Sequence, residues 1–217
     1  LCNDKKKPTK MFWNKKKKII NEDYKALTNY YKWLIKESDD VVIGDTQTEI
    51  ILSEEFLNTF PKLSRLLRKA RILNLTINSN PYKLYSWTNS KGIRCGWINK
   101  FEPESKSNLK IIKEHKLLLN EIGGIWESYN QPEPSLTNNQ EFLFIESECL
   151  SGIGGWDEYY ELVCKQENLK EIDYSEFVGF AREANGDITV YNPSNKEVLL
   201  FAHDHCFENV KFLDNQP

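Results

Sequence analysis

The stretch that decides the fold class runs from Phe177 to Leu213 and reads FVGFAREANGDITVYNPSNKEVLLFAHDHCFENVKFL. It begins with an apolar run of strand length, and the pair Asn185-Gly186 that follows is a strong signal for a tight hairpin turn. The next residues alternate between apolar and polar, and the polar turn NPSN at 192–195 reverses the chain again. The pattern predicts antiparallel strands joined by turns, over 177–183, 187–191 and 198–202.

Helical and extended patterns alternate through the rest of the chain. Ser53 is a candidate N-cap for a short helix, and Pro61 can open the next helix. Helices are predicted over 22–36, between Ser53 and Pro61, from Pro61 to Ala70, over 106–122 and over 156–164. A β-meander is predicted over 73–77, 84–87 and 93–98, with shorter extended pieces at 41–43, 49–52 and 142–145. Helices mixed with mainly antiparallel strands predict an α+β fold, an antiparallel sheet flanked by helices.

The helix over 106–122 has the clearest pattern. Its apolar residues share one face, and His115 on that face is expected to be a core histidine rather than a ligand. Gly123 follows directly and suits the positive φ angle that ends many helices. A turn of this kind is therefore predicted at Gly123.

Length and composition indicate a globular chain. With 217 residues, 40% of them hydrophobic and 12% aromatic, the chain can form an independent core. No apolar run approaches the roughly 20 residues that span a membrane, and the five scattered cysteines lack CxxC spacing. These features predict a cytoplasmic protein with reduced thiols and no membrane partner. Residues 1–20, with eight lysines, are expected to form a basic tail, and residues 21–217 a single domain.

Charge is distributed unevenly. Residues 141–187 hold twelve acidic residues against three basic ones, a net charge of −9. Such a segment is either a solvated surface or a face that attracts a basic partner. It would repel DNA and RNA, so nucleic acid is not an expected partner. The binding interpretation assigns the contacts to six acidic residues and two aromatic anchors: Glu146, Glu148, Asp157, Glu158, Glu161, Glu176, Trp156 and Tyr159.

The cluster His203-Asp204-His205-Cys206 is the main candidate for catalysis or metal binding. If the preceding strand continues, both histidines point to one face and make half of a zinc site. No second cluster of regular spacing supplies the other ligands. The structural alternative is a strand end where Asp204 and His205 bond to turn backbone. A nucleophilic pair of Cys206 or Cys149 with a histidine is another alternative.

Two features of the second half point to a known superfamily. One is LLLNEIGGI at 117–125, a helix that ends in Gly-Gly and runs into a strand. The other is the late series FVGFA, NGD, VLLF and HDH, which begins at Phe177 and ends at His205. Over about residues 110–213 the chain resembles the SUKH superfamily of Knr/Smi-like proteins, which includes many bacterial immunity proteins of polymorphic toxin systems. The resemblance implies an α+β fold, a cognate toxin as partner and no catalytic residue.

The leading hypothesis is a non-enzymatic protein-binding module. It would neutralise a cognate toxin that carries a basic surface, by direct binding through an acidic face and without a cofactor. The acidic segment and the scarcity of catalytic groups support it independently of the resemblance. Two alternatives stay open: a metal-dependent or cysteine enzyme that uses His203, His205 and Cys206, and a regulatory scaffold of the same superfamily.

Overall fold

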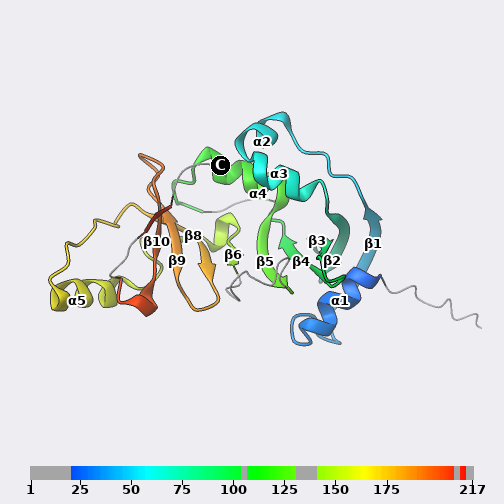
Figure 1. Ribbon diagram of the computed structural model, residues 1–217, viewed down its shortest axis with the longest axis horizontal. Coiled ribbons are helices and arrows are strands. Elements are labelled where there is room, and N and C mark those ends of the chain that lie inside the picture. The colour runs from blue at the N-terminus through cyan, green and yellow to red at the C-terminus, as the bar shows by residue number, and fades with distance from the viewer. Residues whose placement is uncertain (1–20, 104–106, 131–140, 208–210, 214–217) are drawn as a thin grey trace, which may run out of the picture.

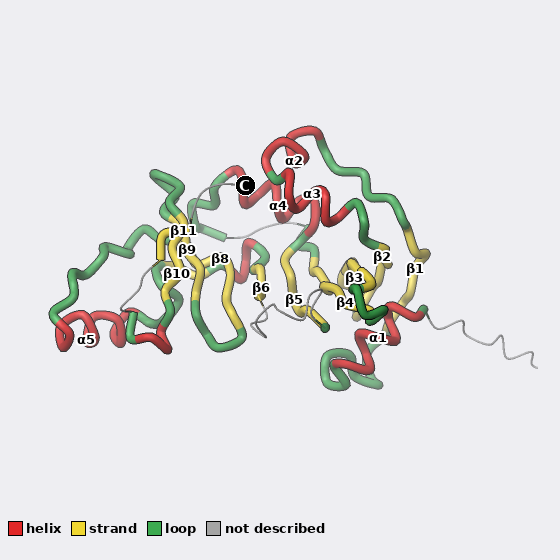
Figure 2. Tube along the Cα trace, viewed as in Figure 1, coloured by secondary structure: helices red, strands yellow, loops and turns green. Residues whose placement is uncertain are grey.

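The computed structural model describes residues 21–103, 107–130, 141–207 and 211–213. These residues form two antiparallel sheets and five α-helices (Figures 1 and 2), which confirms the predicted α+β class. None of these helices is long and apolar enough to cross a membrane. The basic tail predicted for residues 1–20 lies outside the described residues, and the single-domain organisation of residues 21–217 stays a prediction.

The first sheet is a meander in which each strand pairs with the next one along the chain. The pattern correctly predicts its middle strands, and the segment 49–52, predicted as extended, is a loop. In the edge strand β1, the register shifts between Ile43 and Thr46, which marks a β-bulge. The strands are β1 (Val41–Gln47), β2 (Arg71–Ile77), β3 (Asn80–Thr88), β4 (Arg94–Lys100) and β5 (Gly124–Tyr129).

The second sheet contains the stretch that decides the fold class. The turn predicted at Asn185-Gly186 is confirmed: Gly186 has a φ of 101°, and the Asp187 N–H donates to Asn185 Oδ1 at 3.1 Å. The order is β11-β10-β9-β8-β6, and β7 also pairs with β8. The strands are β6 (Glu141–Leu143), β7 (Leu150–Ser151), β8 (Val178–Glu183), β9 (Ile188–Tyr191), β10 (Val198–Phe201) and β11 (Lys211–Leu213).

Helices cover both faces of the first sheet (Figure 1). The Phe56 N–H donates to Ser53 Oγ at 3.2 Å, which confirms the predicted N-cap, and Pro61 stands in the first turn of its helix as predicted. The helices are α1 (Glu22–Tyr30), α2 (Glu54–Thr59), α3 (Pro61–Leu67), α4 (Lys113–Ile122) and α5 (Asp157–Glu167), with short 3₁₀ turns η1 (Glu146–Glu148) and η2 (His203–His205).

Alternation along β2 explains how one strand serves two cores. Leu73 and Leu75 pack with Leu27 of α1, whereas Ile72 packs on the opposite face with Phe56 of α2 and Leu67 of α3. Each face of the first sheet is therefore closed by a different helix layer.

Three helices are shorter than their patterns predict, and one of them, α3, ends at Leu67 instead of Ala70. The helix predicted over 22–36 ends at Tyr30, where Tyr31 leaves helical geometry and its hydroxyl donates to Ser128 O at 2.7 Å. The helix predicted over 106–122 begins only at Lys113, after an extended Ile112. Ile111 is nevertheless buried, in a cluster with Val178 and Tyr191 of the second sheet.

The two sheets meet where β5 and β6 lie side by side (Figures 1 and 2). Gly124 opens β5 at this seam. A Cβ atom there would lie 2.6 Å from Leu143 O and 2.8 Å from Ile145 N. Because those are backbone atoms that cannot rotate away, only glycine permits this approach.

Asp23 fastens α1 to the first sheet. Its carboxylate is buried and accepts two hydrogen bonds from Arg71, both of 2.9 Å, and it also pairs with Arg94. Burial alone would raise the pKa of Asp23, but the hydrogen bonds from Arg71 and Arg94 outweigh burial and hold the pKa below its usual value. One carboxylate thus joins α1 to β2 and β4.

We expect Asp23→Asn to lower the free energy of unfolding by about 2 kcal/mol, because a neutral amide leaves two guanidinium groups without their counter-charge. Urea denaturation at neutral pH measures the change. Glu22→Gln is the matched control, since Glu22 is exposed in the same helical turn. Equal stability of the two variants would show that the buried carboxylate does not fasten α1.

Candidate functional site

Helix α5 lies at the outer end of the second sheet, away from the first sheet (Figure 1). Its inner side packs Tyr160 and Val163 against Val190 and Phe201. The sequence spacing predicts this burial, because positions three and four residues apart share one face. The other side of the helix faces solvent and is here called the α5 face; it consists of Asp157, Glu158, Tyr159, Glu161 and Leu162.

The α5 face combines apolar and acidic side chains. Tyr159 is 40% exposed and Leu162 is 50% exposed, and both stand among carboxylates. Among the described residues, no basic side chain forms an ion pair with the carboxylates of this face. Glu161 accepts a hydrogen bond of 2.6 Å from the Tyr174 hydroxyl. Residues 157–176 carry seven acidic and two basic residues, a net charge of −5.

Trp156, predicted as an anchor for a partner, is half-buried and makes contacts within the molecule. Its ring stacks on the His203 ring with centroids 4.2 Å apart and an interplanar angle of 13°. Its indole N–H donates to Gly186 O at 3.1 Å. His203 in turn lies 2.8 Å from the buried Asp187 carboxylate. Trp156 therefore fixes the start of α5 against the β8–β9 turn.

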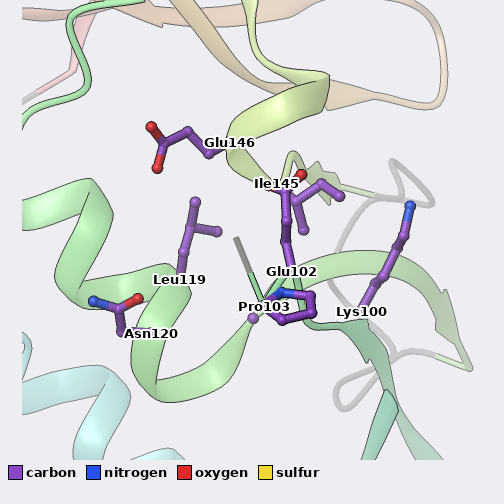
Figure 3. Close-up of a pocket in the computed structure, with 8 residues that line it drawn as sticks. Lys100, Glu102, Pro103, Leu119, Asn120, Ile145 and Glu146 are labelled. Atoms are coloured by element: carbon purple, nitrogen blue, oxygen red, sulfur yellow. The ribbon is translucent and has the colours of Figure 1, made fainter. Parts of the chain in front are cut away.

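The acidic residues predicted to form one face lie in separate places. Glu176 is exposed in the loop before β8, and Glu148 forms an ion pair of 2.8 Å with Lys100 of the first sheet. Glu146 lines a different, small pocket of about 120 Å³ between α4 and η1. Figure 3 shows Glu146 and Lys100 at opposite ends of that pocket, with Leu119 and Ile145 between them.

The zinc hypothesis assumed that the last strand continues through His205. The assumption is wrong, because β10 ends at Phe201 and residues His203–His205 form a 3₁₀ turn. Asp204 accepts a hydrogen bond of 3.1 Å from the Asn185 side chain in the β8–β9 turn. Within the residues that the structure describes, no three His, Cys, Asp or Glu side chains are grouped to hold a metal. The contacts of the His205 side chain lie outside that description.

The cysteines offered as nucleophiles differ in their surroundings. Burial, together with Glu146 and Glu102 nearby, raises the pKa of the Cys149 thiol to about 12. The thiolate is the reactive form of cysteine, so Cys149 is a poor nucleophile at neutral pH. Cys206 is exposed, with a left-handed backbone at a φ of 51°.

A groove at the junction of the two sheets is absent from the sequence-based predictions. It has a volume of about 360 Å³ and is here called the junction groove. Trp33, in the turn after α1, is 63% exposed, whereas Glu127 of β5 is only 3% exposed. Trp33, Ile125, Trp126, Glu127, Phe142, Phe144, Glu148 and Arg182 line the groove.

A β-bulge in β5 shapes the junction groove. Ile98 of β4 pairs with Glu127, but the adjacent Asn99 pairs with Ile125, so Trp126 is an extra residue. Bulges redirect side chains locally, and three successive residues of β5 consequently line the same groove. The alternation of Ile125, Glu127 and Tyr129 was the available signal, because it places a carboxyl among core positions.

Comparison of this chain with known protein families, with curated proteins and with solved structures finds no match in any of the three.

Proposed function

We propose that this protein is a non-enzymatic protein-binding module, an immunity protein that neutralises a cognate bacterial toxin by direct binding. The α5 face is its contact surface, and the partner carries a basic surface of its own. The resemblance of residues 110–213 to the SUKH superfamily supports the same class of partner. No catalytic step and no cofactor enter this function.

The observation that carries the proposal is the exposure of Tyr159 and Leu162 among carboxylates at the outer end of the molecule. Tyrosine is among the residue types that are enriched in the few positions that supply most of the binding energy in protein interfaces. The surrounding carboxylates supply attraction at a distance and select a partner of opposite charge. A surface that is merely solvated requires charged side chains but no exposed apolar ones. The exposure of Tyr159 and Leu162 therefore favours a binding surface.

We expect the double variant Glu158→Lys/Glu161→Lys to slow association with the cognate toxin by about tenfold or more at low salt. The wild-type on-rate should fall steeply as salt rises, because exposed charges are screened beyond about 8–10 Å at physiological ionic strength. Stopped-flow association over a salt series measures both effects. Reversal on a solvated face should change stability by less than about 0.5 kcal/mol, which a thermal melt checks.

The matched control is Glu37→Lys/Glu49→Lys, which makes the same change in net charge at exposed positions around the first sheet. Its on-rate should stay near that of the wild type. A salt-independent on-rate, or an equal loss in both double variants, would remove the α5 face as the contact surface.

Tyr159→Ala tests the apolar part of the α5 face: it should raise the dissociation rate with little effect on the salt dependence of association.

A further inference from the structure

Glu127 is an unusual residue to find on the wall of an aromatic groove. Its side chain is almost fully buried, and glutamate is rarely buried without a partner of opposite charge. Its Oε1 accepts the N–H of the adjacent Ser128 at 3.1 Å, and the Tyr31 hydroxyl is the other polar group near it. Among the described residues, no basic side chain forms an ion pair with it.

The surroundings of this carboxyl oppose its negative charge. Burial raises the pKa of Glu127, and the hydrogen bond from the Ser128 N–H and the nearby Tyr31 hydroxyl only partly offset that effect. Within the described part of the chain, the fold thus bears the cost of a desolvated carboxyl that has no ion-paired cation. A cation brought in from outside would lower that cost, because opposite charges attract strongly where water is excluded.

The aromatic side chains of the junction groove suit a cation that has an apolar stem. The indoles of Trp33 and Trp126 line it together with Phe142 and Phe144. Tryptophan faces attract ammonium and guanidinium groups, and aromatic walls cover the methylene chain that carries such a group. A volume of about 360 Å³ is at the lower end of the range for small-ligand sites and accommodates one long side chain.

The other charges that line the groove are already paired or held. Glu148 pairs at 2.8 Å with Lys100, which is not one of the residues that line the groove. The Arg182 guanidinium lies over the Phe144 ring at 5.9 Å, and its Nη2 donates to Gly154 O at 3.4 Å. Arg182 Nε is buried without a hydrogen-bond partner in the described structure, so an acidic occupant is the natural competitor. Glu127 is more deeply buried than Arg182, and the aromatic lining favours a cation over an anion.

We propose that the junction groove is a second contact site, which takes up one arginine or lysine side chain of a protein partner, with Glu127 as acceptor and Trp33 and Trp126 as aromatic walls. This inference rests on the proposed function in one respect: the basic partner that the α5 face attracts supplies the side chain. The α5 face then governs the association rate of the partner. The junction groove governs the dissociation rate, because it holds one of the partner's basic side chains.

The test uses small probes that differ in charge alone. Nα-acetyl-arginine N-methylamide and its uncharged isostere, Nα-acetyl-citrulline N-methylamide, are titrated into the full chain, and the indole N–H resonances of Trp33 and Trp126 are followed by NMR. We expect the arginine probe to bind about tenfold more tightly than the citrulline probe, since a charge-assisted hydrogen bond distinguishes them. Nα-acetyl-glutamate N-methylamide tests the acidic competitor.

Two variants locate the binding. Glu127→Gln keeps the shape and should reduce arginine binding about tenfold while leaving citrulline binding unchanged. Trp33→Ala should weaken both probes, whereas Tyr30→Ala, at a neighbouring exposed ring, should weaken neither. A thermal melt of each variant verifies folding. Equal binding of the arginine and citrulline probes, preference for the glutamate probe, no shift at either indole up to tens of millimolar, or unchanged arginine binding by Glu127→Gln would each overturn the inference.

The partner itself provides the last measurement. Glu127→Gln should raise the dissociation rate of the toxin complex and leave the on-rate unchanged, whereas reversal on the α5 face lowers the on-rate. The contact role of the α5 face and the contact role of the junction groove can therefore be disproved independently of each other. An unaltered dissociation rate in Glu127→Gln, with the α5 variant still slow to associate, would remove the groove and leave the proposed function. The opposite result would remove the α5 face and leave the groove.

Discussion

Replacing Gly123 by valine should lower the free energy of unfolding by about 3 kcal/mol or more. Gly123 has a φ of 76° and a ψ of −179°, a region of backbone conformation that is essentially reserved for glycine. A Cβ atom there would also lie 2.5 Å from Lys100 O and 3.1 Å from the Phe101 ring. The destabilisation from backbone strain and the destabilisation from a clash with backbone atoms therefore add together at the connection between α4 and β5.

Gly92→Val separates the two contributions. Gly92 has a φ of 75°, nearly the same angle, but a Cβ atom there would meet nothing within 4 Å. Urea denaturation of both variants should show the smaller loss for Gly92→Val, on the order of 1 kcal/mol. If the two variants lose the same free energy, the close approach of Gly123 to Lys100 contributes nothing. A melt unchanged by Gly123→Val would contradict the helix end itself.

Acid should destabilise this protein through His115. The imidazole is buried, with Nδ1 3.3 Å from the Tyr191 hydroxyl, and burial lowers its pKa from 6.5 to about 4. Between these two values the unfolded chain binds a proton that the folded chain refuses, so stability falls as pH falls from 6.5 to 4. The loss attributable to His115 approaches about 3 kcal/mol at the lower end of this window.

The measurement is the free energy of unfolding of the wild type and of His115→Asn at several pH values from 7 to 4. Other groups titrate in both proteins, so the difference between the two curves isolates the histidine. The wild type should lose more stability than the variant on acidification. Parallel curves would contradict the interpretation of His115 as a neutral core histidine.

Local sequence patterns predict most of the fold, because the spacing of apolar residues indicates which positions are buried. The hairpin at Asn185-Gly186 and the cap at Ser53 depend on a few adjacent residues, and both are present as predicted. Helix ends depend on distant contacts instead. Ile111 is buried as its spacing predicts, but it packs from the loop before α4 against the second sheet. Spacing along the chain does not reveal that contact partner.

The candidate site is less predictable for the same reason. Glu158 lies next to Glu161 on α5, and Tyr159 next to Leu162, because residues three positions apart are neighbours on a helix surface. Glu146 and Glu148 belong to the same acidic segment but lie beside the first sheet. The order of charges along a sequence does not show where the charged side chains lie in the folded protein. The junction groove depends on a bulge at Trp126 and on the meeting of two sheets. Neither feature can be recognised in a short segment of the sequence.

The bulge in β1 has a consequence for solubility. β1 is the outer strand of the first sheet, Val42 on it is 58% exposed, and a regular exposed edge of this kind invites strands from other molecules to pair with it. The shift between Ile43 and Thr46 interrupts that edge at Gly44 and Asp45, so an incoming strand finds only a short regular row of pairing groups. The irregular edge strand therefore protects the protein against edge-to-edge aggregation, at the end of the molecule opposite its acidic helix.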